Sequence, residues 1–352
     1  MAISLNGLAE LYRLQGHYKE AETLQIKSLS ILKQELEENH PDIATSLNTL
    51  ATLYASQGRY SEAEPLCVQA LSILEDILGE NHRDVAVCLS RFAELHQAQG
   101  NYSEAEKLFV RSNSIIEQQL GQTHPLVAAG LTKLAELYRL QGRYCEAEPI
   151  LAQALSIGEQ QLGKDHVDLV HPLSGLGILY RLQGRFTEAE PLFIRAISII
   201  EQQLGEAHPH IVQGLGNLAE LYQRMERYTE AEPLFARSAS VLKHLDETHP
   251  YLTKGLNNLA KFYQTQGRHS EAEPLFKRTL LIREQQLGKN HPDVATSLNN
   301  LAGIYMVEGR YDEADPLYVR SLHICESQLG TSHPQTATTL NNLGSLNKKM
   351  ER

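Results

Sequence analysis

The sequence has little of what marks several large classes of protein. Its four cysteines form no CxxC pair and do not recur at a fixed spacing; they are Cys67, Cys88, Cys145 and Cys325. This usage indicates reduced thiols in an intracellular protein rather than a disulfide framework. We therefore expect a cytoplasmic protein.

Long apolar runs and an excess of positive charge are also missing. No stretch approaches the roughly 20 apolar residues that a membrane-spanning helix needs, and charged residues such as Glu10 and Arg13 interrupt any signal-peptide core. The formal net charge is −11, whereas nucleic-acid binding requires a basic footprint. We expect neither a nucleic-acid partner nor a membrane partner, although net charge alone does not exclude a local basic stripe.

What the sequence does contain is one segment repeated along the whole chain. A histidine opens each copy at a constant interval of 42 residues, with one interval of 41, at His40, His82, His124, His166, His208, His249, His291 and His333. A fixed period in this range is the signature of a stacked repeat array, which grows by adding units and not by enlarging one core.

Each copy is predicted to contain two helices joined by short turns. In the second copy, Leu47, Leu50 and Tyr54 recur at helical spacing and form one packed face. Gly58 then ends this helix, because glycine adopts the left-handed conformation of a helix terminus at little cost. The second helix follows from about Ser61.

Two departures from the repeat predict local irregularities. Pro172 lies inside a first helix, where we expect a distortion. Glu226 occupies the position that holds the turn glycine in other copies, and the linker that follows is one residue short. We expect a changed stacking angle near residues 226–249.

The recurring pattern LxxLAxLYxxQGRYxEAExLxxxAL resembles the tetratricopeptide repeat. The longer unit, with LGxxHPDVAxxLNNLA, resembles the repeats of kinesin light chains and their bacterial relatives. In one copy the matching positions are Leu298, Leu301, Ala302, Tyr305, Gly309, Tyr311, Ala314 and Pro316. The resemblance covers essentially the whole chain and implies an all-α, right-handed superhelical solenoid of antiparallel helix pairs.

We expect residues 1–352 to form a single solenoid of about eight helix pairs and a final lone helix. The repeat boundaries are predicted near residues 40, 82, 124, 166, 208, 249, 291 and 333. Since the first copy begins inside a first helix and the last copy ends after one, we expect the chain to be a fragment of a longer protein.

The periodic histidines invite a metal-site interpretation, but their spacing argues against one. Successive helix pairs place them ~10 Å or more apart, whereas zinc ligands converge within about 2.3 Å of the metal. We predict that they cap the helices that follow. No GxSxG elbow, Walker loop or HExxH motif is present, so we expect no enzyme, no cofactor and no metal.

The candidate binding surface is the face of the first helices opposite their packed stripe. The resemblance implies that this face lines a concave groove, and its residues vary between copies while the core does not. Asparagine amides can pair with the backbone of an extended peptide, and lysine or arginine attracts acidic side chains. The predicted groove residues are Asn48, Arg91, Lys133, Arg139, Arg181, Asn217, Arg224, Lys254, Asn257, Asn258, Lys261, Asn299, Asn300 and Asn341.

Other interpretations of these side chains stay open. The asparagines could instead hydrate an exposed face or bond across to the neighbouring repeat. Glu136 and Arg139, at a separation of three, are placed to pair with each other.

The predicted function is a non-enzymatic protein-protein interaction scaffold. Its concave groove would bind an extended peptide or a partner helix, as the kinesin light-chain resemblance implies. The alternative is a self-assembling structural repeat module, a homo-oligomer within a larger signalling or adaptor protein. Both follow from an invariant packing stripe beside a variable polar stripe.

Overall fold

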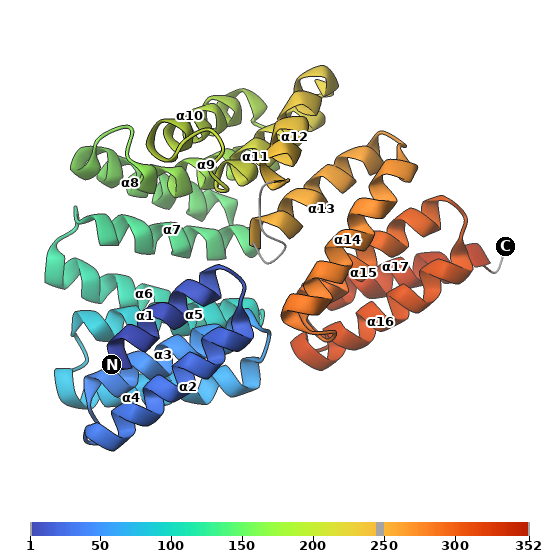
Figure 1. Cartoon of the computed structure of the whole chain (residues 1–352). Helices are drawn as coiled ribbons and strands as arrows, with labels where there is room; N and C mark the ends of the chain where they lie inside the picture. The colour runs from blue at the N-terminus through green and yellow to red at the C-terminus, as the bar shows by residue number, and fades with distance from the viewer. Residues whose placement is uncertain (1, 244–249, 351–352) are drawn as a thin grey trace.

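The computed structural model describes residues 2–243 and 250–350, and every regular element within them is a helix (Figure 1). The first helices are α1 (Ala2–Leu14), α3 (Pro41–Ser56), α5 (Arg83–Ala98), α7 (Pro125–Leu140), α9 (Val170–Leu182), α11 (Ile211–Arg224), α13 (Pro250–Thr265), α15 (Pro292–Val307) and α17 (Pro334–Met350). The second helices are α2 (Tyr18–Glu35), α4 (Tyr60–Leu78), α6 (Tyr102–Leu120), α8 (Tyr144–Leu162), α10 (Phe186–Leu204), α12 (Tyr228–Leu242), α14 (His269–Leu287) and α16 (Tyr311–Leu329). We call the successive pairs, from α1–α2 to α15–α16, units 1 to 8.

Each unit packs mainly against its neighbours in the chain. The two helices of a unit contact one another extensively, and each second helix also contacts the next first helix. This arrangement confirms the predicted all-α solenoid of antiparallel helix pairs.

The linker histidines cap the first helices, as predicted from the sequence. In His40 the ring Nδ1 accepts a hydrogen bond from the backbone N–H of Asp42 at 3.1 Å, which satisfies a donor left free at the helix start. The same bond to the residue two positions later is made by His82, His124, His166, His208, His291 and His333. His249, the remaining predicted boundary, lies outside the described residues.

The turn inside each unit depends on a residue with positive φ. Gly58 has a φ of 70°, and the backbone N–H of Arg59 donates to the carbonyl of Tyr54 to close the end of α3. Glu226 adopts the same left-handed conformation at a φ of 60°, although this region costs a side chain on the order of 1 kcal/mol or more.

Alanine at one position of every second helix forms the centre of each packing layer. These residues are Ala21, Ala63, Ala105, Ala147, Ala189, Ala231, Ala272 and Ala314, and each is 0% exposed. A side chain this small lets neighbouring helices approach closely, and a larger one would overpack the interface. The core is therefore continuous from unit to unit rather than centred in one place.

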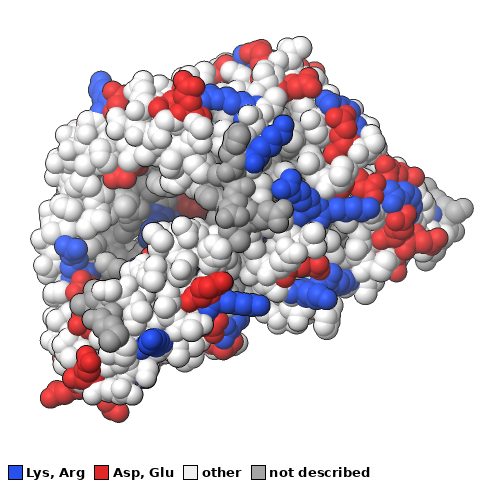
Figure 2. Space-filling view, viewed as in Figure 1, with Lys and Arg blue, Asp and Glu red and all other residues white. Residues whose placement is uncertain are grey.

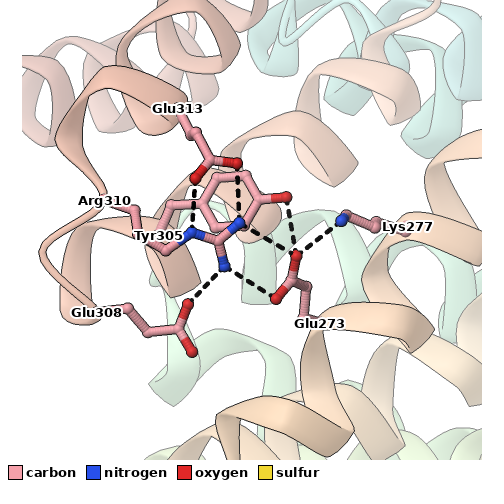
Figure 3. A network of polar contacts seen from close by, with 6 residues as sticks. All are labelled: Glu273, Lys277, Tyr305, Glu308, Arg310 and Glu313. Atoms are coloured by element: carbon pink, nitrogen blue, oxygen red, sulfur yellow. Dashed lines mark hydrogen bonds and ion pairs between the residues drawn. The ribbon is translucent and has the colours of Figure 1, made fainter.

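A repeated polar network fastens each turn to the preceding unit (Figure 3). In unit 8, the Arg310 guanidinium lies 4.0 Å from the centroid of the Tyr305 ring. The same group pairs with Glu273 of the preceding unit at 3.0 Å and with Glu313 at 2.7 Å. Hydrogen bonds from Arg310 and from Lys277 lower the pKa of Glu273 to about 2.

This arginine staple recurs in most units but is missing from unit 3. The stacked pairs are Arg59 on Tyr54, Arg143 on Tyr138, Arg185 on Tyr180, Arg227 on Tyr222 and Arg268 on Tyr263. In unit 3, His96 and Asn101 replace the tyrosine and the arginine. Both carboxylates that would complete the staple, Glu64 and Glu104, are present there, and Glu104 pairs instead with Lys107 at 2.6 Å.

The distortion expected at Pro172 is confirmed. Unit 5 begins with a short 3-10 helix, η1 (Val167–Leu169), before α9 starts at Val170. Proline lacks the N–H that a continuous α-helix would use at this point, so the tighter turn absorbs the mismatch.

The junction between units 6 and 7 differs from the others. Here α13 contacts α11 as extensively as it contacts α12, whereas elsewhere a first helix packs mainly on the preceding second helix. This agrees with the predicted change of stacking, although residues 244–249 of that segment lie outside the described residues.

The units wind into a superhelix that brings the end of the chain back beside its beginning. Figure 1 shows α1–α6 below α7–α12, with α13–α17 on the right beside the first units. Figure 2 shows a hollow on this face between the first units and the arm formed by α7–α10. Within the described part of the chain, no helix is both long and apolar enough to cross a membrane.

Candidate peptide-binding groove

The deepest part of the concave face is a cavity of about 580 Å³ between α7 and α9. Apolar groups form its floor, among them Ala129, Leu169 and the backbone at Gly158. Its rim carries charge, because Lys133 pairs across units with Glu94 at 2.6 Å. An apolar floor with a few polar groups at the edge is the usual composition of a ligand site.

Sequence reasoning did not identify this cavity, although a signal for it was present. The position of Gly158 is occupied in the other second helices by larger residues: Leu32, Leu74, Ile116, Ile200, Leu242, Arg283 and Cys325. Gly158 therefore leaves space that Leu169 fills only in part: its Cδ2 lies 2.5 Å from where a Cβ at Gly158 would stand. The 3-10 turn before α9 shapes the other wall.

The predicted basic residues fall into two groups. Arg139 is held by Glu136 through two hydrogen bonds of 2.7 and 2.5 Å, which confirms the predicted pairing. Lys133 is engaged by Glu94 as described above, and Arg91 donates to Thr52 at 3.4 Å. These cations are partly neutralised within the protein itself.

Arg181 is the most enclosed of the predicted cations. Its side chain is 14% exposed and lies 3.4 Å from Glu220. Its buried Nε has no hydrogen-bond partner among the described residues. Burial lowers the pKa of Arg181; Glu220 opposes this change, and the nearby Arg224 and Arg139 add to it.

A second group of cations is open to solvent on α11 and α13. Arg224, Lys254 and Lys261 are exposed, and none has a salt bridge to another described residue. Figure 2 shows basic side chains gathered on this part of the face. This stripe can attract acidic groups, although the molecule as a whole is negative.

The predicted asparagines are largely used inside the protein. Asn300 donates to Asn257 at 2.8 Å, and Asn342 donates to Asn299 at 3.1 Å, each pair joining two neighbouring units. Asn48 is buried and accepts a hydrogen bond from the Cys88 thiol. The open alternative of bonding across to the neighbouring repeat therefore describes the first four residues.

The remaining predicted amides lie nearer the surface. Asn341 is exposed and Asn258 is half-buried. The Nδ2 of Asn217 is buried and has no partner among the described residues. An unpaired buried donor is costly, so Asn217 is placed to gain a hydrogen bond when a ligand supplies an acceptor.

Metal-ligand sets were searched throughout the described part of the chain. No three histidine, cysteine, aspartate or glutamate side chains gather there in a way that could hold an ion. The linker histidines use Nδ1 in capping bonds and are distributed along the solenoid.

The family of the chain follows from the repeat itself. Residues 1–76, 51–118, 126–202, 168–244, 251–305 and 293–352 match the family model of the tetratricopeptide repeat. The chain therefore belongs to the tetratricopeptide repeat family. No curated protein sequence matches it.

Solved structures with a similar fold include kinesin light chain-like proteins. One is a kinesin light chain of Podosopora anserina with nearly identical TPR-like repeats, at 26% identity over 57% of this chain and 95% of that chain, with a TM-score of 0.49. Another is BtubC (BKLC) from P. vanneervenii, at 22% identity over 67% of this chain and 92% of that chain, with a TM-score of 0.49. The apo form of RapI is similar at 16% identity over 82% of this chain and 99% of that chain, with a TM-score of 0.58.

Proposed function

We propose that the chain is a protein-interaction scaffold whose concave groove binds an extended peptide segment of a partner protein. The observation that carries the proposal is the cavity of about 580 Å³ between α7 and α9, with its apolar floor and charged rim. Family membership supports an interaction role, but the site itself must define what binds.

The groove offers three kinds of contact to such a segment. A large apolar side chain can enter the cavity beside Ala129. The buried amide of Asn217 can donate to a main-chain carbonyl. The exposed cations Arg224, Lys254 and Lys261 can attract acidic side chains further along the groove. An extended chain can reach all three because the first helices stack side by side.

Peptide capture followed by a matched pair of substitutions tests this proposal. The purified chain is used to select binders from a displayed library of short random peptides. Ala129→Phe then fills the cavity from an exposed position of α7, whereas Ala152→Phe makes the same change at an exposed position of α8 outside the cavity lining.

The expected result is a loss of binding in the first variant only. We expect Ala129→Phe to weaken captured peptides by about 2 kcal/mol, or roughly thirtyfold, as for a residue central to an interface. Ala152→Phe should bind like the unmodified chain. Equal affinity of both variants, or failure to select any peptide, would contradict the proposed groove.

A further inference from the structure

Units six apart in the chain touch each other along one side of the superhelix. A Cβ built on Gly58 in unit 2 would lie 2.9 Å from Cδ2 of His291 and 3.0 Å from Cδ of Pro292, at the start of unit 8. A Cβ built on Gly100 in unit 3 would lie 2.6 Å from Cδ2 of His333, at the start of α17. The turns of one superhelical turn thus rest on the linkers of the next, and we call these two contacts the seam.

The equivalent turns elsewhere show that this contact is specific to the first units. Gly142, Gly184 and Gly309 have the same left-handed backbone, with φ values of 75°, 76° and 76°. They are exposed, and a Cβ built on any of them would meet nothing within 4 Å. Gly58, by contrast, is buried. The local turn is the same, and only the neighbour differs.

Burial of one linker histidine marks the centre of the seam. The side chains of His40, His82 and His166 are 41%, 42% and 41% exposed, whereas His291 is 8% exposed. Its ring hydrogen-bonds both to the backbone N–H of Asp293, at 2.9 Å, and to the backbone of Ser56 in unit 2. One side chain thus caps α15 and holds the end of α3.

Two tyrosines of the first units lie close to the same place. Burial raises the pKa of Tyr60 to about 12, and the Asp293 carboxylate raises it further. Burial also raises the pKa of Tyr18, with a smaller contribution from Asp293. Both effects cross from units 1 and 2 to unit 8, so the seam brings together groups more than 200 residues apart.

The seam is thinner than the packing between neighbouring units. Extensive helix-to-helix contact in the described residues is confined to elements close in sequence. Cavities of about 540 and 240 Å³ remain where unit 1 faces the linkers and helices of units 6 and 7. Protein interiors are normally close-packed, so this joint can separate without disturbing any unit.

We propose that the seam closes the side of the groove, so that the groove admits a peptide by its free end, and that parting the seam admits an internal segment of a folded partner. This inference rests on the proposed peptide-binding function. An open solenoid would expose its concave face along its whole length. With superhelical turns joined at Gly58 and Gly100, entry from the side requires the seam to part.

Asparagine substitutions at turn glycines separate the seam from turn strain. Asparagine is among the few residues that tolerate the left-handed region. Gly58→Asn with Gly100→Asn places side chains into His291 and His333, whereas Gly142→Asn with Gly309→Asn places them in open space. Both double variants carry the same backbone cost, so a difference between them reports the seam.

The first measurement needs no ligand. Spin labels are attached at Ser61→Cys and Lys289→Cys, which are exposed positions on the two sides of the seam. Cys145→Ser removes the exposed native thiol, and burial raises the pKa of Cys67 to about 12 and of Cys88 to about 11, which keeps them unreactive.

The seam predicts a short, narrow distance distribution in the otherwise unmodified chain and in the Gly142/Gly309 control. The Gly58/Gly100 variant should show a longer, broader one. A long, broad distribution without the glycine substitutions, no change in the Gly58/Gly100 variant, or an equal change in the control would each overturn the seam.

The second measurement tests entry into the groove. A selected peptide is presented either at the free end of a folded carrier or between two folded domains. The unmodified chain should bind the free-ended form much faster, and the Gly58/Gly100 variant should bind both at similar rates. If the seam is open about a tenth of the time, the enclosed peptide gains about tenfold in apparent affinity.

The outcomes separate this inference from the proposed function. If both presentations bind the unmodified chain equally fast, the gate is overturned and the groove stands. If selected peptides bind but are unaffected by Ala129→Phe, the groove assignment fails, and the ligand-free distance measurement still decides the seam.

Discussion

At the scale of single residues, the linker histidine combines a repeated local role with one exceptional position. Seven described copies accept a backbone hydrogen bond through Nδ1, which favours the neutral ring with its proton on Nε2. Only His291 also bridges to the backbone of a distant unit, at Ser56. The same residue type therefore caps helices throughout and joins superhelical turns once.

The buried position of His291 predicts a pH-dependent seam. Burial lowers its pKa below the ordinary value near 6.5; Asp293 opposes this shift, and Arg283 adds to it. Below about pH 6.5, the open form takes up a proton at His291 more readily than the closed form. The contribution to closure is therefore complete above that pH and is lost as the pH falls through the lowered value.

Labelled chains at about pH 7.5 and 5.5, on either side of the ordinary histidine pKa, test this prediction. The distance should lengthen on acidification in the unmodified chain. His291→Asn retains a capping side chain but cannot titrate, so its distance should change less. An equal pH response in the two chains would assign the effect to other groups.

At the scale of the element, the arginine staple explains how each helix pair is fixed to the preceding one. The Arg310 network joins a turn, a first helix and the preceding second helix through one guanidinium (Figure 3). Unit 3 retains Glu64 and Glu104 but has His96 and Asn101 where the staple needs tyrosine and arginine.

Restoring the staple in unit 3 should stabilise the chain. For His96→Tyr with Asn101→Arg we expect a gain of about 1 kcal/mol in the free energy of unfolding. This combines an exposed cation–π contact and a partly exposed ion pair. Chemical denaturation measures it, with Asn101→Gln as a control that lacks the cation. A double variant no more stable than that control would show that the staple contributes little.

Helix-level features could be predicted from the sequence because their causes lie within one repeat. His40 and Gly58 act on residues only a few positions away. The pairing of Asn257 with Asn300 depends on how two units align across their packed faces. Sequence alone therefore left that amide pairing open beside peptide contact.

At the scale of the whole molecule, the shape depends on how repeated junctions accumulate. The altered packing of α13 on α11 and α12 changes the path of the chain before units 7 and 8. Those units then meet the turns of units 1 to 3 (Figure 1). The contact between Gly58 and His291 has no local signal in the sequence, because it depends on the sum of all intervening junctions.

The groove is the surface that this winding creates, and its charges differ along its length. Lys133 lies beside the cavity, whereas Lys254 and Lys261 lie on α13. A peptide bound along the concave face would pass near these amines. Lys107 and Lys277 lie on second helices and are 67% and 54% exposed, so they report contact outside the groove.

Cross-linking of a selected peptide to lysine tests the central claim most directly. A peptide carrying amine-reactive groups is bound to the chain, and the modified lysines are identified by mass spectrometry. Binding in the groove predicts modification at Lys133, Lys254 and Lys261, suppressed by excess unreactive peptide, with Lys107 and Lys277 unaffected by that competitor. Competitor-sensitive modification confined to Lys107 and Lys277 would contradict the account.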